Sequence, residues 1–137
     1  MTFVIKVLAR CLLFFAMAAC GLASAQSFNG EWDWNDAPGS KTFSIYIKQH
    51  GNRLEGQYCA VAQNGNKIDC EDDGKPNVAG IIDEAEQSSI VDFYSFFGAQ
   101  SGKALLRISK GRLIWHIIES PKGGEFYAPQ NAILDRR

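Results

Sequence analysis

Residues 58–70, Tyr-Cys-Ala-Val-Ala-Gln-Asn-Gly-Asn-Lys-Ile-Asp-Cys, decide the best-defined part of the fold. Asn64-Gly65 is the strongest short-range signal for a two-residue hairpin turn, because both residue types tolerate the positive φ angles of a type I′ turn. Counting outward along the two arms from this turn places Cys59 opposite Cys70. Directly opposed residues of an antiparallel pair lie roughly 5 Å apart at Cα, a separation that suits a disulfide. The stretch therefore predicts a β-hairpin closed by a Cys59–Cys70 bond.

The first 25 residues are typical of a secretory signal peptide. Lys6 and Arg10 precede an apolar run over residues 11–19, and Ala23-Ser24-Ala25 is a small-x-small cleavage site. The apolar run is too short to span a membrane. We expect cleavage after residue 25; the alternative is lipoprotein processing, in which Cys20 becomes a lipid anchor.

Removal of residues 1–25 defines the charge and the cysteine content of the mature chain. Without Lys6 and Arg10, 12 of the 14 basic residues remain against 15 acidic ones, a formal charge of −3. That balance gives no electrostatic footprint for nucleic acid. Cys59 and Cys70 are the two cysteines left, so one disulfide and a periplasmic or secreted location are expected. The remaining residues, about 112, suit a single domain over 26–137.

The chain after residue 25 alternates between short apolar-polar runs and turn signals, and it lacks any long helical period. Phe43, Ile45 and Ile47, for example, share one face of a run whose other face is polar. Eight or nine such strands predict an all-β fold: a single antiparallel meander of about eight strands closed into a barrel, or a sandwich. The expected strands are 28–34, 41–49, 53–62, 66–70, 77–83, 89–97, 103–109 and 112–119, with a final edge strand within 125–134.

The N-terminal third also resembles the avidins, members of the calycin group that includes the lipocalins. The matching residues are Gly30-x-Trp32, Asn35, Gly39-Ser40, Phe43-x-Ile45 and Leu54-x-Gly56-x-Tyr58. The resemblance implies a calycin-like barrel with Asn35, Ser40 and Tyr58 at its mouth. Trp115 is the single later tryptophan, whereas avidins close their pocket with several, so the resemblance implies the fold without biotin binding.

The pattern of the mature chain is similar to a set of small bacterial secreted proteins with no assigned function. That resemblance supports the domain boundaries and implies no activity. The residues that carry it are Tyr58-Cys59, Asn64-Gly65-Asn66-x-Ile68-Asp69-Cys70, Gly102-Lys103-Ala104, Leu113-x-Trp115-x-Ile117 and Tyr127-x-Pro129-x-x-Ala132-x-Leu134.

Two sequence features invite metal or enzyme chemistry. The acidic segment 69–74 has oxygen ligands and a glycine, but Gly80 stands where an EF-hand loop carries its bidentate glutamate, so we interpret the segment as a solvated turn. Asp92 and Glu119 are a conceivable carboxylate pair, although the sequence does not place them together, and there is no Gly-x-Ser-x-Gly elbow. We expect a non-enzymatic protein with no metal site and no cofactor.

The candidate ligand-binding residues are aromatic. Trp32, Tyr58, Phe93 and Trp115 are expected to line a pocket inside the barrel. His116 either donates a hydrogen bond to a ligand in that pocket or is an ordinary sheet-face histidine. Because consecutive aromatic residues continue Phe93 as far as Phe97, some of them should form a second buried layer or an exposed interaction patch.

Two functional hypotheses follow from these residues. The first is a β-barrel that binds an unknown small apolar or extended ligand in its interior. The second is a protein-binding module of the cell envelope, such as an inhibitor or an immunity-type factor directed at a secreted or periplasmic protein. A small hydrolase is the third. An open apolar cavity would favour the first hypothesis, and a solid barrel with an exposed patch would favour the second.

Overall fold

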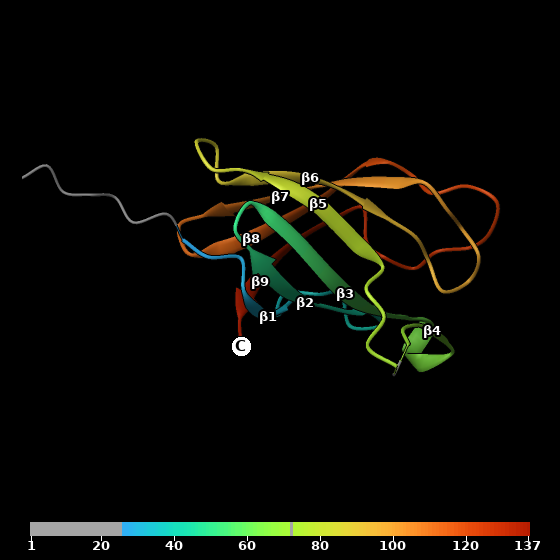
Figure 1. Ribbon diagram of the computed structural model, residues 1–137. Coiled ribbons are helices and arrows are strands. Elements are labelled where there is room, and N and C mark those ends of the chain that lie inside the picture. The colour runs from blue at the N-terminus through green and yellow to red at the C-terminus, as the bar shows by residue number, and fades with distance from the viewer. Residues whose placement is uncertain (1–25, 72) are drawn as a thin grey trace, which may run out of the picture.

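The computed structural model describes residues 26–71 and 73–137 (Figure 1). The expected signal peptide and Cys20 lie outside the described residues. Nine β-strands and one short 3₁₀ turn make up the regular structure of the described part, which contains no α-helix and so none long and apolar enough to cross a membrane. The strands are β1 (Gly30–Asp33), β2 (Thr42–His50), β3 (Arg53–Ala62), β4 (Lys67–Asp69), β5 (Val78–Asp83), β6 (Ser88–Phe93), β7 (Gly102–Ser109), β8 (Arg112–Glu119) and β9 (Asn131–Arg136), and the 3₁₀ turn is Gln63–Gly65.

Eight of these strands close into an antiparallel barrel. Each strand pairs with its neighbours in chain order, except that β3 passes over β4 to pair with β5, and β9 returns to pair with β1. β4 is the extra strand, attached only to the last residues of β3. The sequence prediction of an antiparallel barrel is therefore confirmed, and the sandwich alternative is wrong.

The two ends of the barrel differ in the length of their connections. Short turns join β2 to β3, β5 to β6 and β7 to β8 at one end, the left end in Figure 1. The connections at the other end are longer, and they include residues 70–77, 94–101 and 120–130. This second end is called the loop end below. Loops grouped at one end of a barrel are where ligand sites of such folds lie.

The hairpin that the Asn-Gly signal predicts is present with the expected register. β3 and β4 pair Ala60 with Asp69 and Ala62 with Lys67. Asn64 has φ 54° and ψ 37° and Gly65 has φ 91°, the type I′ geometry that these residues favour. One step beyond the ladder, Cys59 and Cys70 form the predicted disulfide, with 4.5 Å between their Cα atoms.

Two strand predictions need correction. The strand expected over 89–97 ends at Phe93. Tyr94 still donates its N–H to the carbonyl of Asn77 opposite it, but Ser95 donates to the carbonyl of Ala99 within the loop. The last strand is not an edge: β9 pairs with β8 on one side and with β1 on the other, thereby closing the barrel. Pro129 precedes β9, so its missing N–H group removes no hydrogen bond from the β-ladder.

Candidate functional site

Three of the four aromatic residues predicted to line a pocket, Tyr58, Phe93 and Trp115, meet in the barrel core. Trp32 is buried apart from them, and its indole N–H donates to the carbonyl of Phe28 at 3.0 Å. Trp32, Tyr58, Phe93 and Trp115 are all at most 2% exposed. The ring centroids of Phe93 and Trp115 are 5.2 Å apart, and Tyr58 lies about one ring away from each of them, at 6.1 and 6.2 Å. Rings at these separations are in direct contact. The contacting rings therefore fill this part of the barrel interior.

His116 does not join this set. It follows Trp115 directly in β8, and successive side chains of a strand point to opposite faces. Since the indole of Trp115 faces inward, the imidazole of His116 lies exposed on the outer wall, hydrogen-bonded to the side chain of Asn131. The structure therefore gives His116 the position of a sheet-face histidine.

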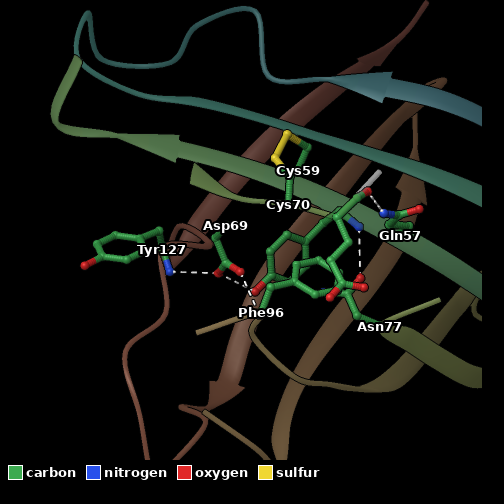
Figure 2. Close-up of a disulfide and its surroundings, with 9 residues drawn as sticks. Gln57, Cys59, Asp69, Cys70, Asn77, Phe96 and Tyr127 are labelled. Carbon is green, nitrogen blue, oxygen red and sulfur yellow. Dashed lines mark hydrogen bonds between the residues drawn. A yellow bond between two sulfur atoms is a disulfide. The ribbon is translucent and has the colours of Figure 1, made fainter. Parts of the chain in front are cut away.

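The expected solvated turn is wrong for Asp69, which is buried at the loop end, and holds for Glu71, Asp73 and Gly74, which are exposed. Asp69 is 0% exposed and accepts three hydrogen bonds (Figure 2). Its Oδ2 accepts from the hydroxyl of Tyr58 at 2.7 Å and from the N–H of Tyr127 at 3.1 Å, and its Oδ1 accepts from the N–H of Phe96 at 2.8 Å. Hydrogen bonds of this kind offset the cost of burying a carboxylate, which has only acceptor sites.

Asp69 thereby ties together three segments that are distant in the sequence. Tyr127 belongs to the connection between β8 and β9, and Phe96 to the connection between β6 and β7. Phe96 also packs against Tyr58, with ring centroids 6.1 Å apart. The two long loops are therefore held over the end of the aromatic core, and they cover it at the end where an open barrel would admit a ligand.

The hydroxyl of Tyr58 is held in its neutral form. Burial, and next the negative charge of Asp69, raise its pKa far above the usual value near 10. The backbone of Tyr58 is held as well, because its N–H donates to Oδ1 of Asn77 at 3.0 Å. β3 pairs with β5 before Tyr58 and with β4 after it, and Asn77 bonds to β3 in the gap between these two pairings.

The avidin-like positions are not gathered around a pocket. Tyr58 is in the core, whereas Asn35 and Ser40 are exposed in the loop between β1 and β2. The side chain of Asn35 donates to Asp135 at 3.0 Å, and Ser40 accepts a hydrogen bond from the N–H of Asn64 through its carbonyl. These hydrogen bonds attach the loop between β1 and β2 to neighbouring parts of the chain.

A hollow of about 590 Å³ lies on the outer wall near the loop end. One row of paired residues crosses it, Glu55–Ala79–Asp92–Lys103–Glu119. Lys103 forms an ion pair with Asp92 at 2.6 Å, with side chains that are 44% and 75% exposed, respectively. Asp92 and Glu119 therefore share a face, as a carboxylate pair would, but two strand spacings, roughly 9–10 Å, and a lysine separate them.

The wall beside this row carries exposed aliphatic side chains. Ile81 and Ile90 face each other across β5 and β6 and are 55% and 59% exposed. Leu105 is paired with Ile90, and Ile114 with Ile133, which is 46% exposed. Leu105 and Ile114 are half-buried and stand diagonally across β7 and β8, because the direct partner of Leu105 is the exposed His116. These five aliphatic residues are called the aliphatic stripe below.

The buried roles of Asp69 and Asn77 were not predicted from the sequence, although the inward direction of Asp69 could have been. The hairpin register pairs Asp69 with Ala60, which shares the parity of Tyr58. Following that parity would have placed the Asp69 carboxylate inside the barrel. Asn77 had no comparable signal, because its partners come from β3 and from the residue after β6.

Comparisons with other proteins add no family assignment: no family model, curated protein or solved structure matches the chain. The part of the chain that the structure describes also holds no group of three or more histidine, cysteine, aspartate or glutamate side chains arranged for a metal ion.

Proposed function

We propose that this protein is a non-enzymatic, calycin-like barrel of the periplasm or the secreted fraction that binds another protein through its outer wall. The observation that carries the proposal is the contrast between the interior and the surface. Trp32, Tyr58 and Trp115 are each 0% exposed, whereas isoleucines are about half exposed on the wall. Aliphatic residues that gather on a surface tend to mark sites of protein interaction.

The chemistry around the aliphatic stripe fits a protein partner. On its loop-end side the stripe borders the charged row that contains Asp92, Lys103 and Glu119. An apolar centre with a charged, solvent-exposed rim is the usual composition of a protein interface. The disulfide supports an oxidising compartment, since such bonds persist outside the cytosol.

Support for a non-enzymatic role comes from the way the buried polar groups are used. The carboxylate of Asp69 is occupied by three donors, and the hydroxyl of Tyr58 donates to it. Both groups are therefore engaged within the protein. On the outer wall, Asp92 is engaged by Lys103 in open solvent.

Site-specific photo-crosslinking in the periplasm tests the proposal. A photoreactive phenylalanine analogue is placed at Ile90 in the stripe, and in a matched variant at Tyr46, which is 46% exposed on the outer face of β2. We expect one discrete adduct from position 90 and none from position 46. Addition of Ile81→Ser to the position-90 variant should abolish the adduct. Equal adducts at both positions, or none at position 90, would contradict a binding surface here.

The second candidate function is the binding of a small apolar ligand, and the barrel topology favours it. Eight antiparallel strands in up-and-down order are the architecture of barrels that hold small molecules. Native mass spectrometry of protein purified from periplasm distinguishes the two functions. A bound small molecule that is lost on denaturation would support this candidate, and the bare mature mass is the result that the filled core predicts.

A further inference from the structure

The seam that closes the barrel is paired over only part of its length. β1 and β9 pair through Trp32–Arg136 and Asp33–Asp135. β1 then ends, because Trp34 begins a turn in which its carbonyl accepts the N–H of Ala37 at 3.4 Å. β9 continues past this point towards the loop end, as far as Asn131.

The alternation of the ladder shows which backbone groups face the unpaired part of the seam. On one side, Ile117 donates its N–H to the carbonyl of Gln130, and on the other, Arg137 donates its N–H to the carbonyl of Glu31. In an antiparallel ladder every second residue bonds to the same neighbour. Even-numbered residues of β9 therefore bond to β8, and the N–H and C=O groups of Asn131 and Ile133 point towards the seam.

These groups have no strand opposite them. Among the described residues, no hydrogen bond reaches the backbone N–H or C=O of Asn131 or Ile133 from the seam side. Unpaired edge groups of this kind are a template for another chain, and proteins normally cover them or blunt them with charge. Here Ile133 extends an aliphatic side chain beside them.

A hollow of about 360 Å³ lies along this open edge. Its lining is mainly apolar, with Trp34 on one side and Ile114 and Ile133 on the other. The aliphatic stripe ends at the same place, because Ile133 is its last member. The hollow thus joins an apolar floor to a backbone edge that can both donate and accept hydrogen bonds.

We infer that the hollow between Trp34 and β9 receives an extended segment of a partner polypeptide, which adds to β9 as a short strand. The inference rests on the proposed function and names its ligand class. Residues two apart in a strand repeat their N–H and C=O groups roughly every 7 Å. An extended polypeptide matches that spacing, and pockets beside the edge select its side chains. Trp34 and Ile133 select β-branched or other apolar residues.

Amide hydrogen exchange with a defined probe tests the inference. The probe is the peptide Lys-Thr-Val-Thr-Val-Thr-Lys, and its control carries an N-methyl group on the first valine, which removes a donor but keeps the side chains. We expect the probe to slow exchange of the Ile133 amide about tenfold or more. The Leu134 amide, already bonded to β8, should not change. The N-methylated peptide should protect Ile133 at least tenfold less.

A pair of variants separates the backbone from the side chain. Ile133→Pro removes the seam-facing donor, whereas Ile133→Val keeps both the donor and a β-branched side chain. We expect the first variant to lose the probe and the second to retain it, with near-ultraviolet circular dichroism confirming the fold. Should the proline variant not fold, the N-methylated peptide provides the same comparison on the unaltered protein.

Three results would overturn the inference. They are no protection of Ile133 at millimolar probe, equal protection by the N-methylated peptide, and protection that rises with protein concentration without any probe, which would make a second copy of the chain the occupant. The proposed function is tested apart from these results. An adduct at position 90 together with an unprotected Ile133 would leave the binding wall standing and remove only the strand addition.

Discussion

Replacing Asp69 by asparagine is expected to destabilise the barrel, although it removes a buried charge. The carboxylate accepts hydrogen bonds from the backbone N–H groups of Phe96 and Tyr127, one on each oxygen. Whichever way the asparagine amide is turned, its NH₂ group replaces one of these oxygens and faces the N–H of Phe96 or of Tyr127. One part-buried donor then loses its partner, which costs about 1–3 kcal/mol. The bonds that remain become neutral and weaken by up to about 1 kcal/mol each.

Relief from burying a charge opposes these losses. A carboxylate moved out of water costs several kcal/mol, and replacing a buried ion is sometimes neutral or stabilising. Because all three donors of Asp69 are already in place, we expect the lost bonds to outweigh this relief. The net loss should be about 2 kcal/mol, which corresponds to a fall in Tm of roughly 8 °C for a domain of this size.

Urea denaturation followed by tryptophan fluorescence measures this change directly. Asp73→Asn is the matched control, because Asp73 is exposed and forms its ion pair with the exposed Lys75, so the variant should stay within about 0.5 kcal/mol of the wild type. Exchange of the Phe96 and Tyr127 amides should accelerate in Asp69→Asn and not in the control. An Asp69→Asn protein as stable as the wild type would refute the conclusion that this carboxylate holds the two loops.

Three further predictions concern single residues. Cys59→Ala should cost about 2–3 kcal/mol of unfolding free energy, as the chain-entropy estimate gives for a short loop, and free thiols in the native periplasmic protein would contradict the bond. Tyr58 stays neutral in the folded protein, whereas a tyrosine in the unfolded chain ionises near pH 10. The contribution of Tyr58 to the free energy of unfolding is therefore complete below pH 10 and declines by about 1.4 kcal/mol per pH unit above it. Tyr58→Phe should lack this decline in urea denaturation at alkaline pH. Gly102→Ala would place a Cβ 2.7 Å from the ring of Phe93, and the resulting displacement should cost about 1–3 kcal/mol in thermal unfolding, whereas Gly39→Ala, with open space around it, should be nearly neutral.

Local patterns were enough to predict most of the strands and one complete register. Alternation located β2, β3, β7 and β8 to within a residue or two, because each has one buried face and one solvent face. The Asn-Gly turn then fixed the pairing of β3 with β4, including the disulfide. A two-residue turn leaves a hairpin no other register, so this inference needed no distant information.

The errors arose where the outcome depended on distant partners. The aromatic run after Phe93 keeps the composition of a strand, but β7 begins at Gly102, opposite Phe93, so residues beyond Phe93 have no β7 residue opposite them. The role of β9 likewise depends on β1, about a hundred residues earlier. His116 differs, because alternation alone requires it to face away from Trp115.

Asp69 shows how the local and the distant information combine in the candidate site. Its inward direction follows from the hairpin register, but an inward carboxylate is tolerable only with donors, and one of them comes from Tyr127, 58 residues away. An apolar residue at this position would bury more easily but would accept no hydrogen bond from Phe96 or Tyr127. The carboxylate therefore selects one arrangement of the two long loops, and that arrangement covers the aromatic core. Under the proposed function, recognition then falls to groups on the outside of the barrel: the aliphatic stripe and the unpaired edge of β9 at which it ends.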